Sequence, residues 1–146
     1  MRRQLLQGIL AVLMCGVAAV AADAPGADKE KIQGKWTVVS GREGGKALTA
    51  DKVKGTQLVI TADTMAVTEG DRKRVMTYKL DASQKPKTID LTTTEGSDLG
   101  KTALGIYSLE GDNLRICFVP PGKERPRTFD TKADNKEMLF VMKRAK

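Results

Sequence analysis

The sequence predicts an all-β fold, in which eight antiparallel strands form an up-and-down barrel after a short N-terminal helical turn. Short segments with β-strand patterns follow one another at regular intervals, with no long helical pattern between them. Glycine, aspartate and asparagine mark the turns between these segments, as is typical of hairpin connections. Several segments alternate apolar and polar residues. Together these observations favour a meander that closes into a barrel over a parallel α/β fold.

The first 22 residues, 1–22, predict a secretory signal peptide. Arg2 and Arg3 precede an almost entirely apolar run over 5–20, and the small residues that follow favour cleavage before Asp23. We therefore expect the mature chain to be exported, either to the periplasm or to the extracellular side of the cell envelope.

The apolar run within this leader could also serve as a membrane anchor. It is shorter than the about 20 residues that a membrane-spanning helix needs, and no second hydrophobic segment follows it. We therefore expect no stable membrane span after cleavage. Cys15 lies in the run and leaves lipid anchoring as an alternative, although Met14 precedes it where lipoprotein processing requires a small residue.

The remainder of the chain predicts a flexible tether over 23–28 and one barrel domain over 29–146. Its basic residues exceed its acidic residues by five once the leader is removed, and its basic clusters are best explained as solvated loops and strand edges. With only six aromatic residues in the whole chain, we expect no nucleic-acid partner. Cys117 is left without a second cysteine, so we expect a half-buried strand residue and no internal disulfide.

The elements of the domain begin with a polar helical turn that ends near Gln33, and Gly34 opens the first strand. A glycine-rich turn over 41–55 contains one further helical turn, which Thr49 or Asp51 can cap. The prolines at 120 and 121 end the seventh strand, because proline cannot continue a ladder of hydrogen bonds. We expect the strands over 34–40, 57–61, 64–68, 73–81, 88–93, 102–109, 114–119 and 136–143.

Alternation along these strands predicts which side chains face the barrel interior. An eight-stranded barrel has room for packed side chains or for one small ligand. We expect the interior residues to line a ligand cavity, although residues of this size could also fill the space. The candidate lining residues are Val38, Leu58, Ile60, Met76, Tyr78, Ile89, Leu91, Ile106, Ile116, Phe118 and Phe140.

Three segments carry a resemblance to a known family. Gly34-Lys35-Trp36 opens the first strand, and Lys85 to Thr92 (KPKTIDLT) and Gly105 to Phe129 are the most specific parts. With these segments, the chain resembles a planctomycete-rich family of small, exported, lipocalin-like domains with no assigned activity. The resemblance covers residues 29–144.

The resemblance implies a role for the Gly-x-Trp motif. In lipocalins and other calycins, this tryptophan plugs the closed end of the barrel, and a basic residue of the last strand packs over it. Gly34, Trp36 and Arg144 would then form the barrel-end signature. Lys143 is the alternative basic residue, but a guanidinium plane stacks better on an indole ring.

The residue types present restrict the chemistry that the chain can perform. The chain has no histidine, which excludes serine–histidine and cysteine–histidine nucleophile systems and makes a zinc site implausible. The carboxylates of Glu95 with Asp98, and of Glu110 with Asp112, lie in predicted turns, where acidic residues serve backbone geometry. We therefore expect no catalytic residue, no metal ion and no cofactor.

A basic loop follows the seventh strand. Arg125 and Arg127 alternate around Pro126, so both could project to one side and contact an anion. The alternative, which we favour, is an ordered loop whose basic side chains form surface ion pairs or point into water.

These observations support three hypotheses about function. The leading hypothesis is an exported, non-enzymatic barrel that binds a small apolar or amphipathic ligand. The alternative is a structural or protein-interaction module of the cell envelope with a filled core, whose protein partner the sequence does not identify. An enzyme is the third hypothesis and the least supported, since no acid–base or nucleophile arrangement is visible.

Overall fold

The computed structural model describes residues 27–131 and 136–145. The expected signal peptide and residues 23–26 of the expected tether lie outside this part of the chain. Within the described ranges, no helix is both long enough and apolar enough to cross a membrane. The elements are α1 (Ala27–Lys31), β1 (Gly34–Glu43), β2 (Lys46–Ala47), α2 (Ala50–Lys54), β3 (Thr56–Ile60), β4 (Thr64–Glu69), β5 (Arg72–Asp81), β6 (Thr88–Glu95), β7 (Thr102–Glu110), β8 (Asn113–Phe118) and β9 (Met138–Arg144).

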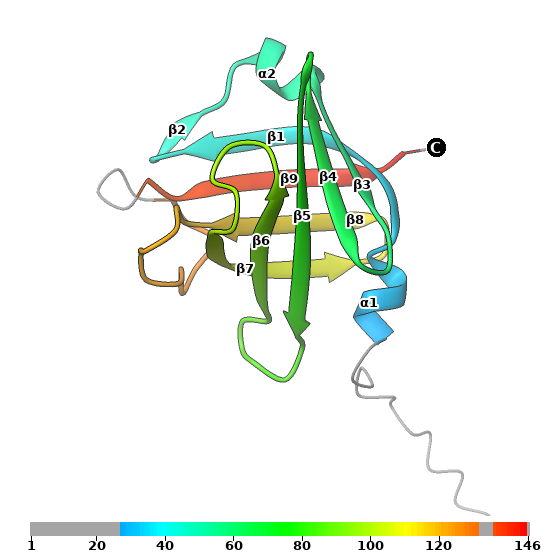
Figure 1. Cartoon of the computed structure of the whole chain (residues 1–146), viewed down its shortest axis with the longest axis vertical. Coiled ribbons are helices and arrows are strands. Elements are labelled where there is room, and N and C mark those ends of the chain that lie inside the picture. Colours follow the sequence, from blue (N-terminus) through cyan, green and yellow to red (C-terminus); the bar gives the residue numbers. More distant parts are fainter. Residues whose placement is uncertain (1–26, 132–135, 146) are drawn as a thin grey trace, which may run out of the picture.

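The long strands close into an antiparallel barrel, which confirms the predicted fold class. From β3 to β9 each strand pairs with the next along the chain, and β1 pairs with both β3 and β9 to close the sheet. The two-residue strand β2 only extends the far end of β1. In Figure 1, β3 to β6 run nearly vertically while β1, β7, β8 and β9 run nearly horizontally, so the barrel has two crossed layers.

The first helix begins earlier than the sequence predicts. Helix α1 starts at Ala27, so Ala27 and Asp28 belong to the barrel domain and not to the tether. Asp28 is buried because its carboxylate is used inside the fold. The second helix is capped by Thr49, whose side chain accepts a hydrogen bond from the backbone nitrogen of Lys52.

Strand β1 also runs further than predicted, through Gly41 to Glu43. A Cβ atom added at Gly41 would lie 2.5 Å from the Leu48 side chain and 2.9 Å from the carbonyl oxygen of Leu139. This glycine therefore permits close packing within the sheet and does not form a turn. The turn follows at residues 44–45, two glycines that both have positive φ.

One end of the barrel is closed by α1 and by apolar packing. Ile32 and Trp36 are almost fully buried members of the core, and the indole Nε1 donates a hydrogen bond to the Ile32 carbonyl oxygen over 2.8 Å. The Asp28 carboxylate accepts hydrogen bonds from the Tyr107 hydroxyl and the Lys87 ammonium group, each at 2.8 Å. These bonds attach the helix to the barrel wall.

The basic residue at this closed end is Arg144, not the lysine before it. Its guanidinium carbon lies 4.4 Å from the ring centroid of Trp36, and its nitrogens donate to the carbonyl oxygens of Gln33 at 2.8 Å and Lys31 at 2.6 Å. Gly34 has a φ of +130°, and an added Cβ there would lie 2.8 Å from Arg144 Nη1. The three residues of the expected barrel-end signature therefore meet in space.

Candidate functional site

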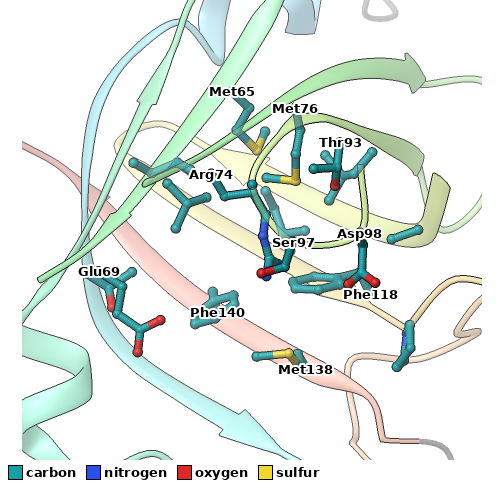
Figure 2. Close-up of a pocket in the computed structure, with 18 of the residues that line it drawn as sticks. Met65, Glu69, Arg74, Met76, Thr93, Ser97, Asp98, Phe118, Met138 and Phe140 are labelled. Atoms are coloured by element: carbon teal, nitrogen blue, oxygen red, sulfur yellow. The ribbon is translucent and has the colours of Figure 1, made fainter. Parts of the chain in front are cut away.

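The other end of the barrel contains a cavity of about 750 Å³. Because neighbouring strands are antiparallel, the last residues of β1, β4, β6 and β8 meet the first residues of β3, β5, β7 and β9 at this end, opposite α1. Figure 2 shows Met65 and Met76 on one side of the cavity and Phe118, Phe140 and Met138 across from them. Pockets of this size with apolar walls are typical of small-molecule sites.

The rim of the cavity is polar and open to water. The loop between β6 and β7 contributes Ser97, Asp98 and Lys101, and the Asp98 carboxylate pairs with the Lys101 ammonium group at 3.5 Å. Figure 2 shows Arg74 and Ser97 near the centre of the opening, above the aromatic side chains. The cavity therefore presents an apolar interior below a charged mouth. The remaining charged residues that line it are Glu43, Lys52, Glu69, Arg72 and Lys73.

Most of the predicted lining residues surround this cavity. These predicted residues come from six different strands. In each strand, every second side chain points toward the barrel interior. Packed beside them are residues that the prediction omitted, notably Met65, Val67 and Ala103. The predicted residues found in the lining are Val38, Leu58, Met76, Leu91, Ile116, Phe118 and Phe140.

Three predicted lining residues face the interior near the closed end, away from the cavity. Ile60 pairs with Gly34 at the start of β1, and Ile89 is fully buried in the core. Tyr78 is half-buried, and its hydroxyl donates to the carbonyl oxygen of Thr61 over 2.6 Å. Burial raises the pKa of Tyr78, and the nearby Asp63 carboxylate adds to this increase. These residues support the floor of the cavity without reaching its surface.

The prediction for Ile106 is wrong, because this residue faces away from the barrel interior. Its cross-strand partner is Cys117, whereas the adjacent pair, Tyr107 and Ile116, belongs to the interior core. Ile106 and Cys117 are almost fully buried all the same. The segment 119–131 lies on the outer side of the sheet here, because Phe129 packs on the outward Arg115 at 4.4 Å and Arg125 donates to the Gly105 carbonyl oxygen at 2.8 Å. Burial therefore occurs on both faces of this part of the sheet, and alternation alone misleads.

Arg125 holds this covering segment against the barrel. Its guanidinium nitrogens donate to the carbonyl oxygens of Ile89 at 3.2 Å and Gly105 at 2.8 Å, and to the Asp90 carboxylate at 2.6 Å. Arg127 is exposed. The two arginines therefore do not form the anion clamp considered from the sequence: Arg125 is used by the protein's own oxygens.

The residue that sequence reasoning missed at the mouth is Arg74. Its cross-strand partner Val67 lines the cavity, and Met76, two positions further along β5, also faces inward. This alternation was readable in the sequence. The basic cluster Arg72-Lys73-Arg74 instead favours a solvated strand edge, because arginine rarely faces a barrel interior.

The described residues include few groups that could act as metal ligands or as a nucleophile at the cavity. Within residues 27–131 and 136–145, no three histidine, cysteine, aspartate or glutamate side chains come together as a metal site would require. The thiol of Cys117 lies on the outer face of the sheet, away from the cavity, and burial together with Glu137 and Asp130 raises its pKa to about 11. A thiol with this pKa is protonated at neutral pH and a poor nucleophile.

Comparison of the chain with protein-family models, with curated proteins and with solved structures gave no match. The class of protein is therefore defined by the fold and site alone: a closed antiparallel β-barrel with an apolar cavity at its open end.

Proposed function

We propose that this protein is an exported, non-enzymatic, lipocalin-like barrel that binds a small apolar or amphipathic ligand at its open end. The observation that carries the proposal is the cavity of about 750 Å³, whose apolar floor lies beneath a polar rim. Such a site favours a ligand with an apolar body and a polar end, because each part then meets groups of its own kind.

The closed end supports this proposal by giving the cavity a fixed base. The hydrogen bond between Trp36 and Ile32, and the bonds from Asp28 to Tyr107 and Lys87, hold α1 across the barrel. With this end covered, the open end is the side from which we expect a ligand to enter. A cavity of this volume favours the ligand-binding barrel over the alternative of an interaction module with a filled interior.

Titration calorimetry with neutral n-alkanols tests the proposal. Burial of one methylene group contributes about 0.8 kcal/mol, so each added carbon should tighten binding about fourfold until the cavity is full. A flat response to chain length, or no binding by any alkanol, would contradict the proposal.

A pair of variants locates the binding site. Ala103 lines the cavity, whereas Ala66 lies on β4 between the inward residues Met65 and Val67 and therefore points outward. We expect Ala103→Phe to weaken alkanol binding at least tenfold and Ala66→Phe to leave it unchanged. Equal effects of the two substitutions would place binding elsewhere. Thermal unfolding of each variant establishes that it is folded.

The non-enzymatic part of the proposal has its own test. It is supported by the absence of histidine from the sequence and by the position of Cys117 outside the cavity. Turnover of a bound compound that disappears when a rim carboxylate such as Asp98 is replaced would contradict it.

A further inference from the structure

We propose that the ligand is an amphiphile with a single carboxylate head, and that Arg74 binds this head at the mouth of the cavity. The inference rests on the proposed function and names the class of ligand that the same cavity takes. The tail would occupy the apolar floor, and the head would stay at the rim.

The position of Arg74 on β5 directs its side chain inward. It pairs across the sheet with Val67 and precedes Met76 by two residues, and both of these residues line the cavity. Figure 2 shows the guanidinium group projecting over the cavity, with Phe118 and Phe140 below it. A charged group in this position sits where the polar end of a bound amphiphile would emerge.

The guanidinium group of Arg74 is available to a ligand. In the part of the chain that the structure describes, the side chain of Arg74 has no hydrogen bond or ion pair to another residue. By contrast, Arg125 and Arg144 are both held by carbonyl oxygens of the barrel. Arg74 therefore offers donors in a fork that matches the two oxygens of a carboxylate.

The loop after β6 adds a second polar group beside Arg74. Gly96 has a φ of +105°, and a Cβ added there would lie 3.3 Å from the Lys73 carbonyl oxygen and 3.5 Å from the Arg74 Cα. The loop backbone thus rests directly on β5, which only glycine allows at this distance and φ. Ser97 follows Gly96 and lines the same cavity as Arg74, and in the view of Figure 2 the two side chains project toward the same part of the opening, so we expect the Ser97 hydroxyl to donate to the same head.

The charges around the mouth favour an anion. The ion pair between Asp98 and Lys101 is neutral overall. Among the other charged residues of the lining, the cations exceed the anions by two. The cations are Lys52, Arg72, Lys73 and Arg74, and the anions are Glu43 and Glu69. A positive mouth raises the local concentration of anionic ligands and disfavours cationic ones.

Three probes with the same alkyl tail separate the head from the tail: dodecanoate, dodecanol and dodecylamine. Each is titrated into the purified protein below the concentration at which it self-associates. At about pH 8 the first is an anion and the third is a cation. We expect dodecanoate to bind about tenfold more tightly than dodecanol, and dodecylamine to bind more weakly than either. An advantage for dodecylamine would mean that Glu43 and Glu69 dominate and would overturn the inference.

Variants of one strand then assign the effect to one residue. Arg74→Gln should reduce dodecanoate affinity to that of dodecanol and leave dodecanol binding within about twofold of its original value, while Arg74→Lys should keep part of the advantage. Lys79→Gln removes the same charge from the outward face of β5 and should change neither affinity. Equal losses in Arg74→Gln and Lys79→Gln would show a general charge effect and overturn the assignment to Arg74.

The two proposals fail in distinguishable ways. If dodecanol does not bind at all, the proposed function fails. If dodecanol binds and dodecanoate binds no more tightly, the cavity stands as an apolar site and the carboxylate inference alone is overturned.

Discussion

The guanidinium carbon of Arg144 lies 4.4 Å from the ring centroid of Trp36, and the same group donates to the carbonyl oxygens of Lys31, the last residue of α1, and of Gln33. One side chain from the end of the chain therefore joins the last strand, the first strand and the helix. Carbonyl groups at the C-terminal end of a helix have no donor within the helix and otherwise bind water. The guanidinium group of Arg144 donates to them instead.

Replacement of Arg144 should therefore destabilise the whole barrel. Arg144→Ala removes the cation–π contact, the hydrogen bonds to the Gln33 and Lys31 carbonyl oxygens, and the exposed ion pair with Asp112 at 3.3 Å, so we expect the free energy of unfolding to fall by about 2 to 4 kcal/mol. Urea denaturation measures this loss. The adjacent Lys143→Ala, at an exposed position, should cost less than about 0.5 kcal/mol. Equal costs at the two positions would contradict the role assigned to Arg144.

Replacement of Gly34 should destabilise the fold, partly because its backbone lies close to the Arg144 guanidinium group. An alanine there would combine a φ of +130°, which is essentially restricted to glycine, with a Cβ 2.8 Å from the guanidinium group. We expect Gly34→Ala to cost about 2 to 4 kcal/mol in unfolding free energy. Gly111→Ala, at a φ of +56° with open space around it, should cost only about 1 to 2 kcal/mol.

A double-mutant cycle separates the two contributions at Gly34. Once Arg144 is alanine, the clash is absent and only the backbone strain remains, so the cost of Gly34→Ala should be smaller in that background. Full additivity of the two substitutions would show that the two residues do not compete for the same space.

The buried carboxylate of Asp28 should stabilise the closed end. Asp28→Ala removes a buried carboxylate that accepts hydrogen bonds from Tyr107 and Lys87, so we expect a loss of about 1 to 3 kcal/mol in unfolding free energy. Glu30→Ala, at an exposed position of the same helix, is the matched control and should have little effect. Indistinguishable denaturation curves for the two variants would mean that α1 is not held by this carboxylate.

Because of the Cys117 thiol, the free energy of unfolding should decrease at alkaline pH. Its pKa in the folded chain is about 11, above its value of about 8.5 in an unfolded chain. The folded state therefore holds the proton more tightly, so stability is unaffected below about pH 8.5 and declines as the pH rises toward 11. Cys117→Ala has no thiol and should not show this decline. The difference in unfolding free energy between the unsubstituted protein and Cys117→Ala should therefore shrink as the pH rises from about 8.5 toward 11. A constant difference would contradict the raised pKa.

The fold could be predicted because its signals are local. Turn residues, and the alternation of Ile89 with Leu91, can be read from short stretches of sequence and do not depend on tertiary contacts. Ile106 could not be placed in the same way. Its strand is buried on both faces, since the segment 119–131 returns over the outside, and that return is a long-range contact.

The candidate site was predictable in its apolar floor and not in its charged mouth. Met76 and Phe118 are large apolar residues that alternate with polar or smaller residues along their strands, and this pattern predicts that they face the barrel interior. Arg74 follows the same alternation as Met76, but an arginine faces inward only where the barrel is open, and nothing local marks the open end. Arg125 presents the opposite case, since its partner Asp90 is distant in the sequence and only the folded chain brings the two together.

Native mass spectrometry of the protein purified from its own host shows whether the cavity holds a small ligand. The sample is compared with the same protein refolded from denaturant, and Ala103→Phe serves as the variant with an obstructed cavity. We expect a mass excess in the native sample that is absent after refolding and absent from the variant. Identical bare masses in all three samples would contradict this expectation.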